Sequence, residues 1–445
     1  MLPKHLRVLA VLSQRPGQTG SGVYLRELAS QLSKLGHEVH LLAAGYEILT
    51  RNDFPQLPNE QIHTVTFSDK NSNNTVDLNF PISGMSLDMP YLHIPFRNLN
   101  KWMLEKYISV WISRIQELVD KIQPDIIHVN HLWLLPEITR LAAPKLPIIA
   151  TAHGSSILLL QDKPDFSSLI TPGINALDAI ISVSQNLALS IEEIFNIPRE
   201  KVFVIENGYN PHLFRVQPRN LVIPKVQEII PSLVPYHYKK IVLFVGKFAA
   251  YKGLPYLLRA AEIFNKSLSG ILTLIVGDGS RDVRNSLEDL VNQLQLKERV
   301  LLPGKLPYSK IGLVMNLADV FVLPSTYEGF GIVLLEALAC GTRSVASDLH
   351  GPLTFVPKSL QQQGFVTLVK PPILTNDGQS NIIEEEEYVR ALAKAIAKQL
   401  DETTSETERS LIANSIRGRD WPSQIKKTEQ LYFKVISSKY TKKIC

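Results

Sequence analysis

The sequence has few cysteines, no long apolar run and no strong excess of charge, and each absence argues against a class of protein. Among its 445 residues only Cys340 and Cys445 are cysteines, so a disulfide framework is not expected and a reducing, cytoplasmic environment is indicated. No window holds the roughly 20 apolar residues that a membrane-spanning helix needs. The formal charge of +5 is small for this length and does not indicate a nucleic-acid-binding protein.

Length and composition indicate a soluble globular protein with two domains. The chain is 45% hydrophobic and 20% charged, and it is too long for one ordinary hydrophobic core. Its first residues, MLPKHLRVLAVLS, contain a short apolar stretch that Arg7 interrupts. This pattern favours a first β-strand over a signal peptide.

The first half of the chain alternates between strand and helix patterns. Residues 6–13 predict a strand, the loop PGQTGSG follows, and a helix pattern then ends at Gly36 before the strand EVHLLAAG. One face of this helix carries Leu25, Leu28, Leu32 and Leu35. The result is a βαβ unit with a glycine loop at its first turn. Because the loop lacks the fingerprint GxGxxG, a turn needed only for its geometry is the alternative to a ligand-binding loop.

Three segments depart from this alternation. Residues 50–100, with polar runs such as SDKNSNNT, are expected to form a long, mobile surface segment. The proline-rich residues 216–238 are interpreted as a linker between domains. Residues 94–123 predict a helix or a helix pair that mixes aromatic and basic side chains. An amphipathic helix packed on the core is favoured there over a face that binds a membrane surface or a lipid acceptor.

Two apolar segments, DIIHVNH and PIIATAHG, predict buried parallel strands that end in histidine. Ligands of open α/β sheets bind at the carboxyl ends of the strands, which places His128, His131 and His153 near a ligand. Hydrogen-bonded core residues are the alternative for His128 and His131. A zinc site is not expected, since no cysteine or acidic residue stands at a matching spacing.

The second half repeats the alternation over residues 239–411 and contains the stretch LPSTYEGFGIVLLEALACG. There a buried strand, a glycine loop and a helix start follow one another, which leaves free N–H groups and a positive helix end suited to an anion. Glu328 and Glu336, eight positions apart, add carboxylates suited to hydroxyl groups. The local chemistry therefore predicts binding of a sugar nucleotide. The acidic run Glu384–Glu387 is expected only to stabilise the first turn of a later helix.

An ordered set of motifs now resembles a known family: GHEV, TAHG, VIENGYNPHLF, VGKFAAYKG, IVGDG and EGFGIVLLE. Across nearly the whole chain they resemble the retaining GT-B glycosyltransferases of family 4. The resemblance implies an α/β fold with two Rossmann-like domains facing a central cleft. The expected domains are an acceptor domain at 1–215, a linker at 216–238, a nucleotide-sugar donor domain at 239–411 and a helix at 412–445 that returns to the first domain.

The resemblance also implies a reaction and a set of site residues. A sugar would pass from a nucleotide-diphosphate sugar to an acceptor hydroxyl with retention, without a cofactor and without a metal, and the chain has no Asp-x-Asp. The implied catalytic residues are His153, Glu328 and Lys252. The implied donor-binding residues are Gly20, Lys247, Lys252, Gly277, Glu328, Gly329, Phe330, Gly331, Ile332, Val333 and Glu336, and the acceptor side would include Tyr24, His128 and His131.

Within this set each charged residue has an expected partner. Glu336 matches the family glutamate on the ribose hydroxyls, Glu328 the one beside the donor sugar, and Lys252 the lysine on the diphosphate. His153 matches the histidine beside the reacting centre. Plain alternatives are a solvated surface lysine at 252 and an ordinary exposed helix residue at 336.

Three positions depart from the family pattern. Lys247 stands where arginine is more common, and it keeps the charge without the bidentate fork. Thr19 replaces a glycine beside Gly20 and restricts the backbone there. The segment SDLHGPLTFV has His350–Gly351 and Leu353–Thr354 where the family shows Gly-Gly and Pro-Glu, so the sugar specificity is open.

Two other functions remain as alternatives, a nucleotide-sugar epimerase and a non-catalytic, glycosyltransferase-like binding subunit. The expected partners are a nucleotide-sugar donor and a sugar, lipid-linked or small-molecule acceptor, without nucleic acid. The protein is expected in the cytoplasm, and residues 94–114 offer a peripheral membrane contact.

Overall fold

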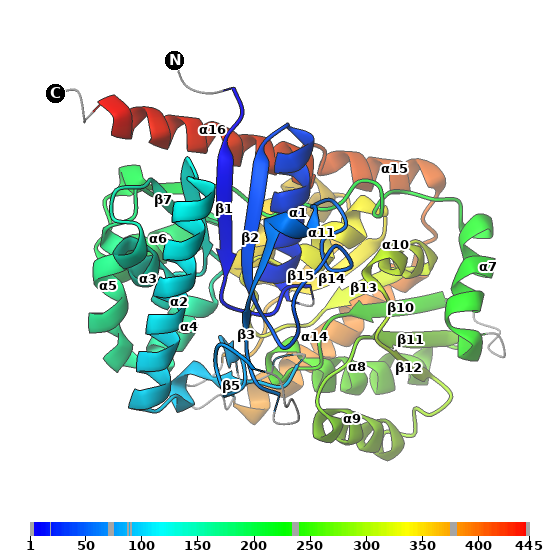
Figure 1. Ribbon diagram of the computed structural model, residues 1–445. Coiled ribbons are helices and arrows are strands. Elements are labelled where there is room, and N and C mark those ends of the chain that lie inside the picture. The colour runs from blue at the N-terminus through cyan, green and yellow to red at the C-terminus, as the bar shows by residue number, and fades with distance from the viewer. Residues whose placement is uncertain are drawn as a thin grey trace. The chain divides into compact units, whose positions relative to one another are not determined.

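The computed structural model describes residues 4–17, 19–69, 75–86, 89, 91–233, 240–373 and 381–441. Its contacts divide the chain into two compact units, Met1–Asn207 with Trp421–Cys445, and Gly208–Asp420. From the sequence, we predicted that the first domain ends at residue 215 and the second at residue 411, whereas the two units meet at residues 207–208 and 420–421. Each unit contains its own parallel sheet with helices packed on it (Figure 1). The chain is therefore an α/β protein with two Rossmann-like domains.

The first unit is built on a seven-stranded parallel sheet in the order β3-β2-β1-β6-β7-β8-β9. Because the order reverses between β1 and β6, the carboxyl ends of these two strands flank the position where such sheets bind ligands. The strands are β1 (Arg7–Leu12), β2 (Glu38–Gly45), β3 (Ile62–Thr66), β6 (Ile126–Asn130), β7 (Ile148–Ala152), β8 (Ala179–Ser182) and β9 (Val202–Val204). A separate two-stranded pair joins β4 (Ser83–Gly84) and β5 (Ile94–Pro95).

Seven helices of this unit connect or cover the strands. They are α1 (Gly20–Lys34), α2 (Lys101–Ile122), α3 (Leu134–Ala142), α4 (Ser155–Asp162), α5 (Ser167–Asn175), α6 (Gln185–Phe195) and α16 (Trp421–Thr441). In α1, Leu25, Leu28 and Leu32 are fully buried as predicted, whereas Leu35 is 39% exposed. Leu35 differs because it is the C-cap residue, one position beyond the last helical turn. Gly36 follows it with φ +89°, as expected for a residue that ends a helix.

The prediction of a long surface segment at residues 50–100 was wrong for much of its length. Residues 62–66 form β3, the edge strand, which pairs in parallel with β2 from Leu41↔Ile62 to Gly45↔Thr66. Phe67, Phe80 and Ile82 are buried in the main core. The β-branched residues of β3 supply the strand preference, which the flanking polar runs concealed. Residues 70–74, from the polar run SDKNSNNT, lie outside the described residues.

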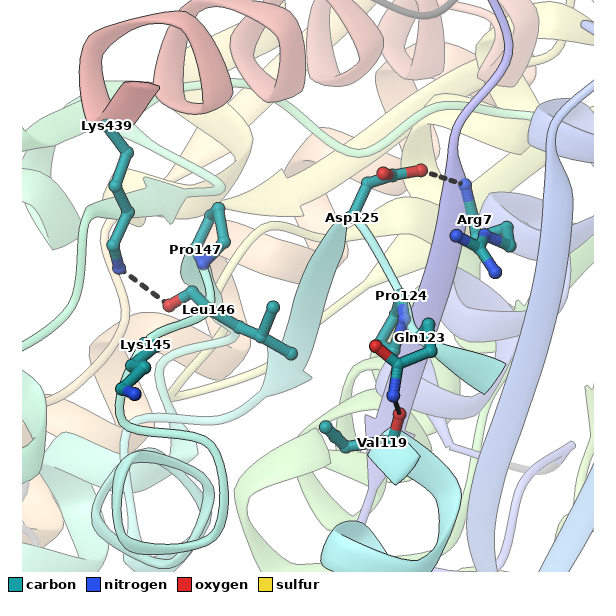
Figure 2. A pocket seen from close by; sticks show the side chains of 9 residues that line it. All are labelled: Arg7, Val119, Gln123, Pro124, Asp125, Lys145, Leu146, Pro147 and Lys439. Carbon is teal, nitrogen blue, oxygen red and sulfur yellow. Dashed lines mark hydrogen bonds between the residues drawn. The ribbon is translucent and has the colours of Figure 1, made fainter. Parts of the chain in front are cut away.

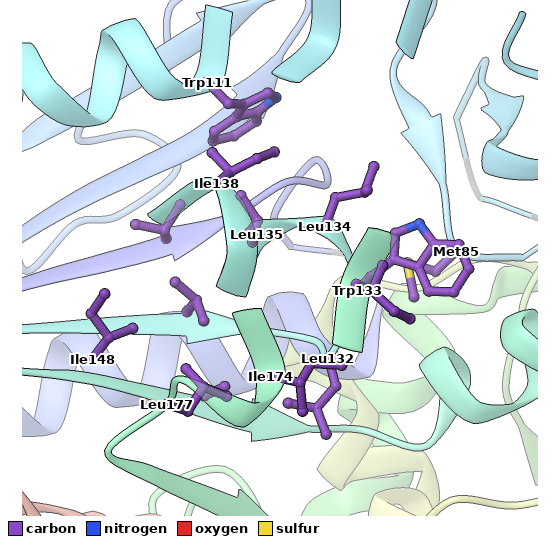
Figure 3. Packing of buried hydrophobic residues seen from close by; sticks show 14 of the residues in the cluster. Met85, Trp111, Leu132, Trp133, Leu134, Leu135, Ile138, Ile148, Ile174 and Leu177 are labelled. Carbon is purple, nitrogen blue, oxygen red and sulfur yellow. The ribbon is translucent and has the colours of Figure 1, made fainter. Parts of the chain in front are cut away.

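Within residues 94–123, Lys101–Ile122 form one long helix, α2, which follows β5 and a short 3-10 turn at Phe96–Asn98. Phe96, Tyr107 and Trp111 are fully buried in the core, which confirms the core-packed interpretation of this helix. Figure 3 shows Trp111 of α2 above Ile138 and Leu135 of α3. The buried face of α2 therefore packs on α3, the helix that follows the carboxyl end of β6.

The last helix, α16, belongs to the first unit although the second unit precedes it in the chain. It packs on α1, and its Trp421 and Tyr432 are fully buried. Its polar contacts include His37 Nε2, 2.8 Å from Glu429 Oε1, and His128 Nδ1, 2.6 Å from Tyr432 Oη. The sequence predicted a helix at residues 412–445 that returns to the first domain.

The second unit is built on a six-stranded parallel sheet in the order β12-β11-β10-β13-β14-β15. Its strands are β10 (Lys240–Val245), β11 (Ile271–Val276), β12 (Val300–Gly304), β13 (Val320–Leu323), β14 (Arg343–Ser347) and β15 (Val366–Val369). Its helices are α7 (Arg219–Ile229), α8 (Leu254–Ser267), α9 (Arg281–Gln293), α10 (Tyr308–Leu317), α11 (Ile332–Ala339), α12 (His350–Phe355), α13 (Lys358–Gln362), α14 (Ile382–Asp401) and α15 (Glu406–Ser415). Here the order reverses between β10 and β13.

The prediction of an irregular linker at 216–238 was also wrong. Residues 219–229 form α7, which packs on α10 within the second unit, and residues 234–238 lie outside the described residues. Pro218 precedes the helix and Pro224 lies inside it, so proline content concealed the pattern. Val222 and Val226, four residues apart, are the buried side of α7.

Among the described residues, no helix combines the length and apolar character that crossing a membrane requires.

Candidate functional site

In the second unit, the loop between β13 and α11 presents free backbone N–H groups. Gly331, with φ +92°, is the N-cap of α11, and no side chain caps the helix. The N–H groups of Ile332 and Val333 therefore have no helical acceptor, and both residues are half-buried. The positive end of α11 adds to them. This start of a helix lies at the carboxyl end of β13, as the sequence predicted.

The loop after β10 packs directly on the loop after β13. Gly253, with φ +67°, lies so close that a Cβ there would be 1.9 Å from the carbonyl oxygen of Pro324. Thr326 N donates a hydrogen bond to Tyr251 O at 2.8 Å. Only glycine permits this approach at residue 253, so the two loops at the reversal of strand order form one surface.

On this surface Lys252 and Glu328 form an ion pair. Lys252 Nζ donates to both carboxylate oxygens of Glu328, at 2.7 and 3.0 Å. The side chains are 13% and 11% exposed, respectively. The structure thus brings together two of the three predicted catalytic residues, and it excludes a solvated surface lysine at 252. The pairing itself was not predicted.

A second lysine lies beside the pair. Lys247 Nζ and Lys252 Nζ lie 5.0 and 5.5 Å from the centre of the Tyr251 ring. Such placement of cations over an aromatic face is favourable. Burial, and to a lesser extent the charge of Glu328, raise the pKa of the neighbouring Tyr327 to about 12, so its hydroxyl stays protonated. Two lysines therefore lie over the Tyr251 ring, one of them paired with Glu328.

Glu336 lies further along α11 and is 4% exposed, which excludes an ordinary exposed helix residue. Tyr308 Oη, from α10, donates to Glu336 Oε1 at 2.6 Å. A buried carboxylate is retained only where hydrogen bonds stabilise it. Tyr308 is thus a site residue that the sequence did not reveal, because nothing in PYSKIGLV marks it as a partner of a residue in the next helix.

The remaining predicted donor residues surround the same loops. Gly277, with φ +149°, lies against β10, where a Cβ would be 1.7 Å from Gly246 O, so close packing explains this glycine. Gly329 lies in the loop itself, and Phe330 is buried against Phe355, with ring centres 4.7 Å apart. Phe330 therefore offers the site only its backbone.

The altered segment at 350–354 borders the loop of Glu328. It forms most of α12, and a Cβ at Gly351 would lie 2.6 Å from Glu328 O and 3.1 Å from Phe330 Cα.

The acidic run at 384–387 has a structural role, since Arg259 pairs with Glu385 at 3.6 Å and also with Glu386.

In the first unit, His131 and His153 follow β6 and β7 and lie together, with ring centres 4.9 Å apart. Burial lowers the pKa of His131 to about 4. Its backbone has φ +74°, unusual for a residue other than glycine, and its buried Nε2 has no hydrogen-bond partner among the described residues. Such an unpaired buried group is a binding-site signal.

Tyr24 and His128 are buried and already paired. Thr151 Oγ1 lies 3.0 Å from Tyr24 Oη and 2.7 Å from His128 Nε2, while His128 Nδ1 contacts Tyr432. Burial lowers the pKa of His128 to about 3, so its ring is neutral. These contacts hold α1 and α16 to the sheet. The acceptor role predicted for Tyr24 and His128 stays a prediction, and their contacts are structural.

The glycine loop after β1 is also explained by packing. Thr19 is the N-cap of α1, and its hydroxyl accepts a hydrogen bond from Gly22 N at 3.1 Å. A Cβ at Gly22 would lie 2.5 Å from Gly17 N, whereas one at Gly20 would meet nothing within 4 Å. Thr19 therefore serves the helix start, and the open space lies beside Gly20.

A pocket of about 260 Å³ lies at the other edge of this sheet, where β1, β6 and β7 begin (Figure 2). Arg7 and Lys439 line it, but Arg7 Nη1 donates to Ile122 O at 2.8 Å and Lys439 Nζ to Leu146 O at 2.7 Å. Asp125 adds a negative charge. Arg7 and Lys439 thus satisfy backbone carbonyls, and the candidate site remains at the carboxyl edges.

Two family models match the chain in succession. The model described as Glycosyltransferase Family 4 matches residues 19–213, and the one described as Glycosyl transferases group 1 matches residues 225–417. These ranges fall largely on the first and second units, respectively.

Individual proteins agree with the family models. The chain is 28% identical over 351 residues to an uncharacterized glycosyltransferase of Methanocaldococcus jannaschii, covering 76% of this chain and 78% of that protein. It is 24% identical to the N-acetyl-alpha-D-glucosaminyl L-malate synthase of Bacillus anthracis, covering 85% and 88%. The structure of Anabaena HepE in complex with UDP and glucose has a similar fold, with a TM-score of 0.68, 18% identity and coverage of 96% and 99%.

The matched models, the relatives and the fold agree on one assignment. The two Rossmann-like units, with Lys252, Glu328 and Glu336 on the second and His153 on the first, carry the motifs that suggested the family. The chain belongs to the GT-B glycosyltransferases of family 4, also described as group 1, and it is a hexosyltransferase.

Proposed function

We propose that the donor is a nucleoside diphosphate sugar that binds at the carboxyl edge of the second unit's sheet. The observation that carries this proposal is the Lys252–Glu328 pair beside the uncapped start of α11. A diphosphate would accept hydrogen bonds from the N–H groups of Ile332 and Val333 and would be attracted by Lys252 and Lys247. The carboxylate of Glu328 would then be released toward a hydroxyl of the sugar.

The nucleoside end of the donor fits the buried glutamate. Glu336 would accept hydrogen bonds from the ribose hydroxyls while keeping the bond from Tyr308. In support, the HepE structure contains UDP and glucose on a similar fold. UDP is therefore the first nucleotide to test.

We propose a reaction that retains the anomeric configuration and uses no metal. The bond between C1 of the sugar and the phosphate oxygen breaks, and a bond forms between C1 and the acceptor oxygen on the same face. The proton of the acceptor hydroxyl passes to the departing phosphate oxygen. Lys247 and Lys252 stabilise the negative charge that develops on the diphosphate. In other enzymes, removing one hydrogen-bond donor that stabilises such a charge lowers the rate by a factor of about 10²–10³.

The acceptor side is proposed on the first unit. His131 and His153, which lie together after β6 and β7, would contact the sugar and the acceptor hydroxyl. The relative from Bacillus anthracis is named for L-malate, so a small hydroxy acid is included among the acceptors to test, together with sugars and lipid-linked sugars.

The experiment is transfer from UDP-sugars, with product configuration determined by NMR. We expect that UDP is released only when an acceptor is present. The new linkage should have the same anomeric configuration as the donor, and the rate of transfer should not fall in EDTA. Lys252→Ala should lower kcat/KM at least a hundredfold, whereas Glu288→Gln, a charge change on the exposed face of α9, should not. An isomeric UDP-sugar formed without acceptor, or equal activity of Lys252→Ala, would reject the proposal.

A further inference from the structure

One buried amide at the end of β6 connects β1 to the ring of His153. Asn130 is fully buried; its Nδ2 donates to Val11 O at 3.2 Å, and its Oδ1 lies 3.0 Å from His153 Nε2. Val11 lies on β1 and His153 directly after β7. The side chain of Asn130 therefore spans the place where the strand order reverses.

The backbone carbonyl of Val11 determines which way this amide faces. A carbonyl oxygen only accepts hydrogen bonds, so it must face the NH₂ group of Asn130. The reverse orientation would place two carbonyl oxygens 3.2 Å apart in a buried position and leave both without a donor. Oδ1 of Asn130 must therefore face His153.

The same logic assigns the proton on His153. Because Oδ1 is an acceptor only, the ring nitrogen 3.0 Å from it, Nε2, must be the donor. A neutral imidazole carries one proton, so Nδ1 then holds a lone pair. No described residue bonds to Nδ1, and the His153 side chain is half-buried rather than sealed.

The surroundings of His153 keep its ring neutral. Burial is the largest cause that lowers its pKa well below 6.5, and the His131 and His128 rings add to it. The aromatic rings packed on it are His131, at 4.9 Å, and Tyr24, at 5.1 Å between centres. Burial raises the pKa of Tyr24 to about 12, so that group carries no charge.

We propose that Asn130 is a positioning residue that holds His153 as the Nε2–H tautomer, with Nδ1 presented as an acceptor for a hydroxyl of the sugar substrates. The use of Nδ1 rests on the proposed function, whereas the tautomer rests on the hydrogen bonds alone. Loss of a residue that orients a metal-bound histidine typically costs about 10- to 100-fold, and we expect a loss of similar size here.

The tautomer can be measured without substrates. Two-dimensional ¹⁵N–¹H NMR of the full chain labelled in histidine distinguishes a protonated from a bare ring nitrogen, and His153→Gln identifies the signals of His153. We expect a protonated Nε2 and a bare Nδ1 in the wild type and in Asn130→Asp. The aspartate keeps an acceptor toward Nε2, but its second oxygen faces Val11 O, so this variant should be less stable than the wild type. Asn130→Leu should give a mixture. A protonated Nδ1 in the wild type would overturn the proposal.

Activity then tests the use of Nδ1. Asn130→Leu should lower kcat about 10- to 100-fold with little change in the KM of the donor. At neutral pH, Asn130→Asp should be more active than Asn130→Leu. An ionised aspartate beside Nε2 should raise the pKa of His153, because the negative charge stabilises the protonated ring. Protonation removes the lone pair of Nδ1, so the acid limb of the pH profile should move to higher pH.

Ser182→Ala is the matched control, since Ser182 is a fully buried polar residue at the end of β8 that donates to Ser184 O at 2.8 Å. It should lose stability without a shift of the acid limb. Equal losses in both Asn130 variants with an unmoved limb would show a merely structural role and overturn the proposal. If no sugar is transferred by the wild type while NMR shows the Nε2–H tautomer, the proposed function fails and the tautomer assignment stands.

Discussion

Removing the charge of Glu328 should tighten the binding of a free nucleoside diphosphate. Both carboxylate oxygens of Glu328 accept hydrogen bonds from Lys252 Nζ, at 2.7 and 3.0 Å. A diphosphate must therefore compete with this carboxylate for the same ammonium group. Glu328→Gln keeps the shape of the side chain and removes its charge, which frees Lys252 for the ligand.

The size of the effect follows from the pair's surroundings. Opposite charges 4 Å apart attract by about 4 kcal/mol near a protein surface and by about 1 kcal/mol in water. With side chains 13% and 11% exposed, the pair lies nearer the first case. Water and the ligand replace much of the lost attraction, so we expect a gain of about 1–2 kcal/mol in UDP binding. That gain corresponds to a Kd about 5- to 30-fold lower.

Isothermal titration calorimetry with UDP measures this directly on the full chain. Lys252→Met should weaken UDP binding, and Glu288→Gln should leave it unchanged, because Glu288 pairs with Arg284 at 3.0 Å on an exposed helix. Transfer by Glu328→Gln should nevertheless be slower, since it lacks the carboxylate that we propose binds a hydroxyl of the sugar. UDP binding that is equal or weaker in Glu328→Gln would refute the competition between Glu328 and the diphosphate.

Three further predictions concern stability and reactivity. Tyr308→Phe removes the donor at 2.6 Å from the buried Glu336 and should lower the free energy of unfolding by about 1–3 kcal/mol in urea titrations. Gly253→Ala should lower the melting temperature and abolish UDP binding, because its Cβ would meet Pro324 O at 1.9 Å, whereas Gly364→Ala, also at positive φ but in open space, should lower the melting temperature less. Burial raises the pKa of the Cys340 thiol, so iodoacetamide at pH 8 should label Cys340 only after denaturation, as mass spectrometry of its peptide would show.

The sequence allowed prediction of the elements whose patterns are local. Leu25, Leu28 and Leu32 repeat at helical spacing, and all three are buried in α1. The strand, glycine loop and helix start around Gly331 also follow from neighbours in the chain. In contrast, β3 is an edge strand of five residues between polar runs, and α7 contains Pro224, so local composition concealed both.

Contacts between residues far apart in sequence were beyond such an analysis. Lys252 and Glu328 were each recognised by motif, but their pairing depends on two loops that Gly253 brings together. Tyr308 donates to Glu336 only because α10 lies beside α11. Likewise, Tyr24 lies in the expected helix and His128 in the expected strand, and only the contacts with α16 and Thr151 show that their polar atoms are already engaged.

The position of α16 has a consequence for the order in which the protein folds during synthesis. The first unit comprises residues at both ends of the chain, whereas the second unit is one continuous stretch, Gly208–Asp420. Trp421, Glu429 and Tyr432 are synthesised after the whole second unit, yet α16 packs on α1 and supplies the hydrogen-bond partners of His37 and His128. Before α16 is in place, the apolar surface of α1 is exposed to water and His128 lacks its hydrogen-bond partner Tyr432. The second unit can therefore complete its fold before the first, and the first unit is completed only when α16 has been synthesised and packs on it.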